Sequence, residues 1–317
     1  MIEPPEKPNR NRAIAAGVTM IAITAIQFVA ARFSLRDHLT SVDIASLRFV
    51  GASAIFLPII WKTGVEKLKA LGWQRAATLA VLVGLPYPTI INTGLTYAPA
   101  AHAAALCPAS IVFFSFLLSR VVFKETIQLA RIIGIVTIIA GLLLFISPVG
   151  NDTGNVLYGD LLFVGSGVMF STYAILIRQW AVDPITATAA VVLLSCLPLP
   201  IVHVLVKSGL GAATATEIIA QLVIQGFLAG AASMLLYTYV VRQLGPQIAS
   251  LFLPSVPIAT TAVAMLVLGE VPTSRQFGAM LIMTVGMIYP ALQRQPARPR
   301  ADPAAGTATE HRAPEKW

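Results

Sequence analysis

Charged residues are scarce in this chain. Asp, Glu, Lys and Arg make up 11% of its 317 residues, whereas hydrophobic residues make up 56%, and the mean hydropathy is +0.78. Soluble domains carry roughly 25% charged residues, and a soluble core of this size could not bury so much apolar surface. The composition therefore excludes an ordinary soluble protein and predicts an all-α membrane protein, with the lipid bilayer as its partner.

Cysteines and catalytic motifs are scarce too. The two cysteines, Cys107 and Cys196, both fall inside predicted helices, so the sequence predicts no disulfide framework, no metal site and no cofactor. The zinc-protease motif HExxH and the nucleophile motif GxSxG are absent. The chain is therefore not expected to be an enzyme, and an intramembrane enzyme remains the alternative from a different class.

Apolar runs of crossing length recur along the chain, since about 20 apolar residues make one crossing. Ten transmembrane helices are predicted at 13–31, 43–61, 76–96, 100–119, 129–147, 159–178, 185–206, 217–240, 247–268 and 275–292. The joints are short and leave no room for a soluble domain. A signal peptide is the alternative for the first run, but an uncleaved anchor is preferred because the run is long and another membrane helix follows.

The basic residues sort to alternate loops. Most of the 22 Lys and Arg fall on one side of the predicted membrane, and the other side holds only Arg32, Arg36, Lys207 and Arg275. The positive-inside rule then places both termini in the cytoplasm, in a bacterial-type inner membrane. The predicted cytoplasmic segments are residues 1–12 and a disordered tail, 293–317. The net charge of +8 follows from this topology, and no nucleic-acid partner is expected.

One segment of the chain occurs twice. Residues 105–125, ALCPASIVFFSFLLSRVVFKE, and residues 250–270, SLFLPSVPIATTAVAMLVLGE, are both apolar, carry proline near the start and end at a glutamate. Aligning Glu125 with Glu270 also aligns Gly141 with Gly286. The predicted halves are 13–147 and 156–292. Because each half holds five helices, the second enters the membrane from the opposite side, which is an inverted-topology repeat.

The sequence resembles the EamA-type members of the drug/metabolite transporter superfamily. The resemblance rests on the stretches GLTYAPAAHAAALCPASIVFFSFLLSRVVFKETIQLARIIGIVTIIAGLLLF and YVVRQLGPQIASLFLPSVPIATTAVAMLVLGEVPTSRQFGAMLIMTVGMIY, and on DIASLRF at the second helix. It implies a compact ten-helix transporter whose central cavity is lined by helices one, three, four, six, eight and nine. Val112 departs from the family pattern, which often has a proline there, as Pro257 stands before Glu270.

Prolines mark three of the helices that the resemblance places around the cavity. Proline removes a backbone donor and bends a helix, and a carbonyl freed within lipid needs a partner or must line a cavity. The predicted kink or gating residues are Pro86, Pro88, Pro108, Pro254 and Pro257. The alternative is that these kinks only improve packing. The repeated acids, Glu125 and Glu270, are interpreted as turn-forming, helix-capping residues at opposite faces rather than as substrate ligands.

Polar side chains inside the predicted helices are the candidates for binding substrate, because buried polar groups in a membrane are costly. They are Gln27, Tyr87, Asn92, His102, Tyr173, Tyr237, Ser250 and Arg48. Arg48 lies about 7 Å from the outer end of its helix, and the alternative for it is a structural role, in which it snorkels outward or pairs with a neighbouring acid or a helix end. His102 is also a candidate proton relay.

No Asp or Glu lies in the middle of a predicted helix. Proton-driven transporters commonly use an intramembrane carboxylate, so the sequence favours a facilitator, an exchanger or weak coupling through histidine. A phosphate-bearing substrate favours clustered Lys and Arg, and the predicted membrane helices contain a single Arg away from their ends. The prediction is a permease that exports small organic metabolites, most plausibly amino acids, by alternating access. The alternative substrates are phosphorylated or nucleotide-linked sugars, and a homodimer stays open.

Overall fold

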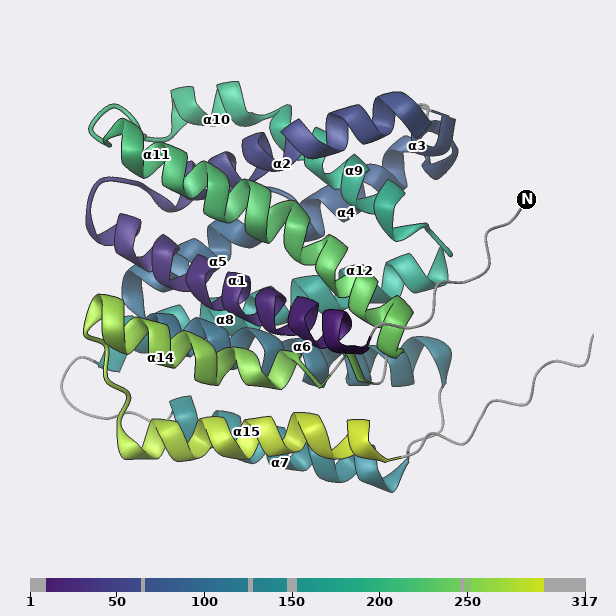
Figure 1. Cartoon of the computed structure of the whole chain (residues 1–317), viewed down its shortest axis with the longest axis vertical. Helices are drawn as coiled ribbons and strands as arrows, with labels where there is room; N and C mark the ends of the chain where they lie inside the picture. Colours follow the sequence, from purple (N-terminus) through teal and green to yellow (C-terminus); the bar gives the residue numbers. More distant parts are fainter. Residues whose placement is uncertain are drawn as a thin grey trace, which may run out of the picture.

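The computed structural model describes residues 10–63, 66–124, 128–146, 153–245, 248–249 and 251–293. Within these ranges the chain forms a bundle of helices that run roughly along one direction (Figure 1). The elements are α1 (Arg10–Arg36), α2 (Ser41–Thr63), α3 (Glu66–Leu71), α4 (Trp73–Val83), α5 (Pro86–Tyr97), α6 (Ala100–Phe123), α7 (Leu129–Ile146), α8 (Thr153–Gln179), α9 (Pro184–Cys196), α10 (Leu199–Leu205), α11 (Ala215–Gln221), η1 (Leu222–Ala232), α12 (Ser233–Leu244), η2 (Leu253–Ser255), α14 (Val256–Leu268) and α15 (Ser274–Leu292).

Several of the predicted membrane segments are interrupted within the described residues. The third is divided into α4 and α5 by a break before Pro86, and the seventh into α9 and α10, which are bent by 40° where Pro198 and Pro200 remove backbone donors. The eighth is α11, the π-helical segment η1 and α12 in succession. Breaks of this kind are tolerated at membrane depth where the freed backbone groups are buried in protein.

Among the residues that the structure describes, seven helical segments are long and apolar enough to cross a membrane, or up to eight if the bent pair counts as one crossing. The predicted count was ten. The helix at Leu253–Leu268 is shorter than a full span, and α15 opens with the polar stretch SRQ, which lowers its hydropathy. The all-helical membrane architecture is confirmed, whereas the number of crossings stays a prediction.

The helices pack in pairs that join the two halves of the chain. α15 packs along α7 at one side of the bundle, α14 packs against both α1 and α6, and α6 packs against α8 (Figure 1). α2 packs against η1, and α4 against α9. Two buried hydrophobic clusters fill the spaces between these helices, one around α6 and the other between α2, α4 and α9.

Small residues bring α7 and α15 close together. A Cβ added at Gly134 would lie 2.7 Å from the carbonyl oxygen of Gly286 and would also meet the ring of Pro290. Gly141 faces Met283 in the same way. In lipid, where no hydrophobic effect drives helices together, close backbone approach supplies the packing energy. These glycines therefore pack helices within one chain.

The predicted kink residues lie mostly at helix starts. Pro86 and Pro88 stand in the first turn of α5, Pro254 lies in η2, and Pro257 stands in the first turn of α14. Pro108 alone lies inside a continuous helix, α6. A first-turn proline costs no hydrogen bond, because that N–H has no partner within the helix. Their gating role stays a prediction.

The first and last described helices end on the same side of the bundle. The start of α1 and the end of α15 both lie at the same end of the bundle (Figure 1). Residues 1–9 and 294–317, which hold most of the predicted cytoplasmic segments, lie outside the described residues, as does Glu125. The opposite end of the bundle, where α1 meets α2 and where the α5–α6 and α14–α15 junctions lie, is called the distal end below.

Candidate functional site

Glu270 is the centre of an ionic cluster at the distal end. Its carboxylate accepts from Arg32 Nε at 3.1 Å and from the guanidinium of Arg36, both on α1. Its second oxygen accepts from the backbone N–H of Ala100 at 2.9 Å, which is the first residue of α6. Arg32 also donates to the carbonyl oxygen of Leu95 at the end of α5. One carboxylate thus ties α1, α6 and the α14–α15 junction together.

This arrangement refines the expectation for Glu270. The residue does cap a helix, but the helix is α6 from the other half of the chain rather than its own. A carboxylate at a helix N-terminus is favoured because the first N–H groups lack partners within the helix. The Glu270 side chain is only 10% exposed and that of Arg32 13%, so water screens this pair little.

A cavity of about 160 Å³ opens beside this cluster. Its lining combines charged and apolar groups: Arg32, Arg36, Pro99, Ala101, His102, Phe145, Glu270, Val271, Pro272 and Gln276. These residues come from α1, α6, α7, α15 and the junctions before α6 and α15. The cavity therefore lies where the two halves meet at the distal end.

His102 makes a buried pair with Asp160 beside this cavity. His102 Nδ1 lies 2.7 Å from Asp160 Oδ1, and the two side chains are 4% and 2% exposed. The other ring nitrogen, Nε2, lies 2.9 Å from Gln276 Nε2 on α15, and the ring meets Phe145 edge-on with centroids 4.6 Å apart. The pair connects α6, α8 and α15.

Asp160 lies deeper in its helix than the sequence predicted. The sequence predicted that the sixth helix starts at residue 159, whereas α8 begins at Thr153. Asp160 therefore lies about 10 Å along the helix. Next to Asp160, Gly159 packs closely on the end of α5, where an added Cβ would lie 2.8 Å from both Ala98 Cβ and the carbonyl oxygen of Gly94.

A second polar group lies between α1, α2 and η1. Arg48 donates from its guanidinium to Gln27 Oε1 at 3.1 Å, and Gln225 Nε2 donates to the backbone carbonyl oxygen of Gln27 at 2.9 Å. Within the described part of the chain, no carboxylate lies within ion-pair distance of Arg48. One form of its structural alternative, pairing with a neighbouring acid, is thus not seen there. The structure brings two of the predicted candidates, Gln27 and Arg48, into direct contact.

Aromatic candidates form a separate row on α5 and α8. The Tyr87 ring lies 5.9 Å from that of Phe170, which lies 5.7 Å from that of Tyr173. All three rings are partly buried, and so is Tyr237 on α12. Asn92 is buried near the distal end instead, where its Nδ2 donates to the carbonyl oxygen of Ser41 at 3.3 Å. Ser250 lies outside the described residues.

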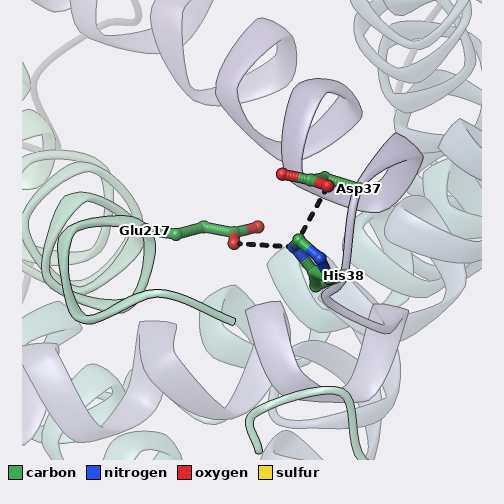
Figure 2. A group of neighbouring side chains, drawn as sticks. All are labelled: Asp37, His38 and Glu217. Atoms are coloured by element: carbon green, nitrogen blue, oxygen red, sulfur yellow. Dashed lines mark ion pairs between the residues drawn. The ribbon is translucent and has the colours of Figure 1, made fainter. Parts of the chain in front are cut away.

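Two further carboxylates join the halves at the distal end. Figure 2 shows His38 between Asp37 and Glu217, with its Nδ1 at 3.0 Å from Asp37 and at 3.5 Å from Glu217 on α11. The fully buried Asp43 accepts from Ser208 Oγ at 2.7 Å and from the backbone N–H of Gly209 at 2.8 Å. The distal end is thus closed by several polar contacts between segments far apart in sequence.

The sequence did not single out Arg32, Arg36, Asp160 or Gln276. Arg32 and Arg36 stood out only as rare basic residues on the sparsely charged side, and that rarity was the available signal. Gln276 carried the signal of a capping box, because Thr273 precedes it by three residues. Nothing in the local pattern indicates that these residues share one cavity.

The comparisons with known proteins decide the family. The model of the EamA-like transporter family matches residues 11–147 and again residues 157–289. The chain belongs to this family. It is 25% identical over 272 residues to an uncharacterized transporter from Archaeoglobus fulgidus, an alignment that covers 84% of this chain and 94% of that one. It is 21% identical over 270 residues to the uncharacterized transporter YyaM from Bacillus subtilis, covering 81% and 88%.

The fold is shared with a protein of known crystal structure. That structure superimposes with a TM-score of 0.60 at 17% sequence identity and covers 90% of this chain and 98% of that chain. At this identity the likeness shows the fold alone. Family membership and the apolar helices make this chain a multi-pass membrane transporter, as the sequence predicted.

Proposed function

We propose that this EamA-family transporter exports small metabolites that carry a carboxylate and an apolar portion, with amino acids as the main class. The observation that carries this proposal is Arg48, a guanidinium inside the bundle whose partner is a neutral amide. A charge within a membrane span is costly and usually functional. A substrate carboxylate would give it the paired, charge-assisted hydrogen bonds that Gln27 cannot.

The surroundings of Arg48 fit a substrate with both polar and apolar parts. Gln27 and Gln225 supply neutral amide donors and acceptors, which suit an amino group without adding charge. Tyr87, Phe170 and Tyr173 supply rings on the neighbouring helices α5 and α8. One guanidinium is too little for a phosphate, which favours clustered basic groups.

We propose further that the chain crosses the membrane ten times, as two inverted five-helix halves with both termini cytoplasmic. The helix pairs support this arrangement, because exchanging the halves maps the α1–α14 pair onto α6–α8 and leaves α7–α15 unchanged. Rocking of the halves about the polar centre would then give alternating access. If this topology holds, a reporter protein that is active only in the cytoplasm should be active when it is fused after the last residue.

Counterflow in liposomes tests the substrate class. Liposomes that contain the purified protein are loaded with one unlabelled amino acid. Their uptake of labelled neutral and aromatic amino acids is then compared with their uptake of labelled organic phosphates. We expect saturable exchange of amino acids in wild type and a loss of at least tenfold in Arg48→Gln, because the carboxylate loses its charged partner.

Arg75 provides the matched control. It stacks over the Trp180 ring at 5.4 Å, away from Gln27, so Arg75→Gln should transport as wild type does. Exchange confined to phosphates would contradict the proposed substrate class, and unchanged amino acid exchange in Arg48→Gln would contradict the proposed site.

A further inference from the structure

The His102–Asp160 pair is a buried pair of ionisable side chains beside the cavity at the distal end. Both side chains are almost fully buried, and the pair adjoins the cavity that Arg32, Arg36 and Glu270 line. We propose that His102 and Asp160 bind a proton, and that proton uptake opens the distal end and so couples transport to the proton gradient. The inference rests on the proposed transport function and adds its energy source.

The hydrogen bonds around His102 define the proton's position. Gln276 Oε1 accepts from the backbone N–H of Thr273 at 2.9 Å and from Thr273 Oγ1 at 3.1 Å. This capping box directs the Gln276 amide nitrogen, a donor, toward His102 Nε2. His102 Nε2 must therefore accept, and Nδ1 then carries the hydrogen that it donates to Asp160. The closed structure thus holds His102 with a free acceptor at Nε2 for Gln276 and with Nδ1 directed at the Asp160 carboxyl group.

A proton added to this imidazole disturbs the closed arrangement. The proton goes to Nε2, which is the nitrogen that accepts from Gln276. Two donors then face each other at 2.9 Å, and Gln276 satisfies the new N–H only by turning its oxygen away from Thr273. The first turn of α15 then loses the half of its capping box that the Gln276 side chain supplies, and α15 directly follows the junction that holds Glu270. Protonation is thereby linked to the ionic cluster.

The charges around the pair also favour opening of the distal end when a proton is added. Those that face the cavity or the pair are Arg32 and Arg36 from α1, Glu270 before α15 and Asp160 from α8. α7 contributes only the neutral Phe145, and Arg275, beside Gln276 on α15, does not line the cavity. Two guanidinium groups and two carboxylates balance, so proton uptake leaves one net positive charge. That charge repels Arg32 and Arg36 and favours entry of water at the distal end.

Cysteine accessibility measures this opening without any substrate. Ala101 lines the cavity and is 4% exposed, whereas Val271 at its rim is 72% exposed. Ala101→Cys and Val271→Cys are made separately in a chain with Cys107→Ala and Cys196→Ala, and labelled in liposomes by an external membrane-impermeant thiosulfonate. The Ala101 rate divided by the Val271 rate cancels the intrinsic pH dependence of the reagent. We expect this ratio to rise by about tenfold or more from pH 8 to pH 5.5.

Variants separate His102 from the other titratable groups. His102→Asn and Asp160→Asn should each abolish the rise. His38→Asn should keep it, because His38 is a distal-end histidine with carboxylate partners outside the cavity. If the buried variants do not fold, Gln276→Ala keeps both titratable groups and removes the link, so the rise should fall below about twofold.

Three results would overturn the proposal: no rise in the parent chain, a full rise in His102→Asn or a full rise in Gln276→Ala. Because the assay contains no substrate, these results leave the counterflow experiment unaffected. A chain that exchanges amino acids but shows no pH-dependent opening would be a transporter without this coupling site.

Discussion

Replacing Glu270 by glutamine tests whether its carboxylate holds the distal end closed. Glu270 accepts three hydrogen bonds, from Arg32, Arg36 and the backbone of Ala100. Glutamine keeps one acceptor oxygen, loses the charge and turns an amide donor toward one of these donors. The side chain of Arg32 is only 13% exposed, so its charge would lose its partner in a poorly solvated place.

The expected loss follows from these contacts. A hydrogen bond to a charged group contributes about 1.5–3 kcal/mol, and the contribution of Arg36 is discounted because its side chain is 44% exposed. A loss of about 2 kcal/mol in the stability of the closed state corresponds to a change of about 30-fold in the opening equilibrium.

Labelling of Ala101→Cys at pH 8 measures that equilibrium. Glu270→Gln should raise the normalised rate about 30-fold. Glu217→Gln is the matched control: Glu217 also joins the halves at the distal end, but its partner His38 is 40% exposed, so the rate should change by about threefold or less. A folded Glu270→Gln protein that labels within threefold of the parent would refute the reasoning, as would equal effects in the two variants.

Two further predictions concern stability, read as the midpoint of thermal unfolding in detergent. Gly134→Ala should lower the free energy of unfolding by about 1–3 kcal/mol, because the added Cβ would overlap α15. Gly278→Ala is the control and should be neutral or stabilising, because nothing lies within 4 Å of the added Cβ. Equal effects of the two substitutions would contradict the α7–α15 packing. Asp43→Asn should cost about 2–4 kcal/mol, since four donors meet this buried carboxylate. Asp183→Asn, an exposed helix cap, should cost less than about 0.5 kcal/mol, and the opposite order would contradict this account.

The sequence alone determined the class and the family of this protein. Apolar runs of crossing length have one stable form in lipid, because every backbone N–H and C=O must be satisfied within the segment. Each of the ten predicted segments is mostly helical within the described residues, with breaks inside several of them. The repeated segment ending at Glu270 pointed to a residue that proves central at the distal end. Polar residues inside apolar helices were equally visible, and two of them, Gln27 and Arg48, meet.

Only the tertiary structure decided which polar groups act together. Asp160 was the second residue of the predicted sixth helix, and only the structure, in which α8 begins at Thr153, places it about 10 Å along the helix. Its partner His102 is 58 positions away, and Arg32 is 238 positions from Glu270. A sequence pattern gives the helix that carries a residue, but not the neighbour it faces, because that depends on how helices from the two halves pack. The packing of helices from the two halves therefore creates the ion pairs and the buried pair at the distal end.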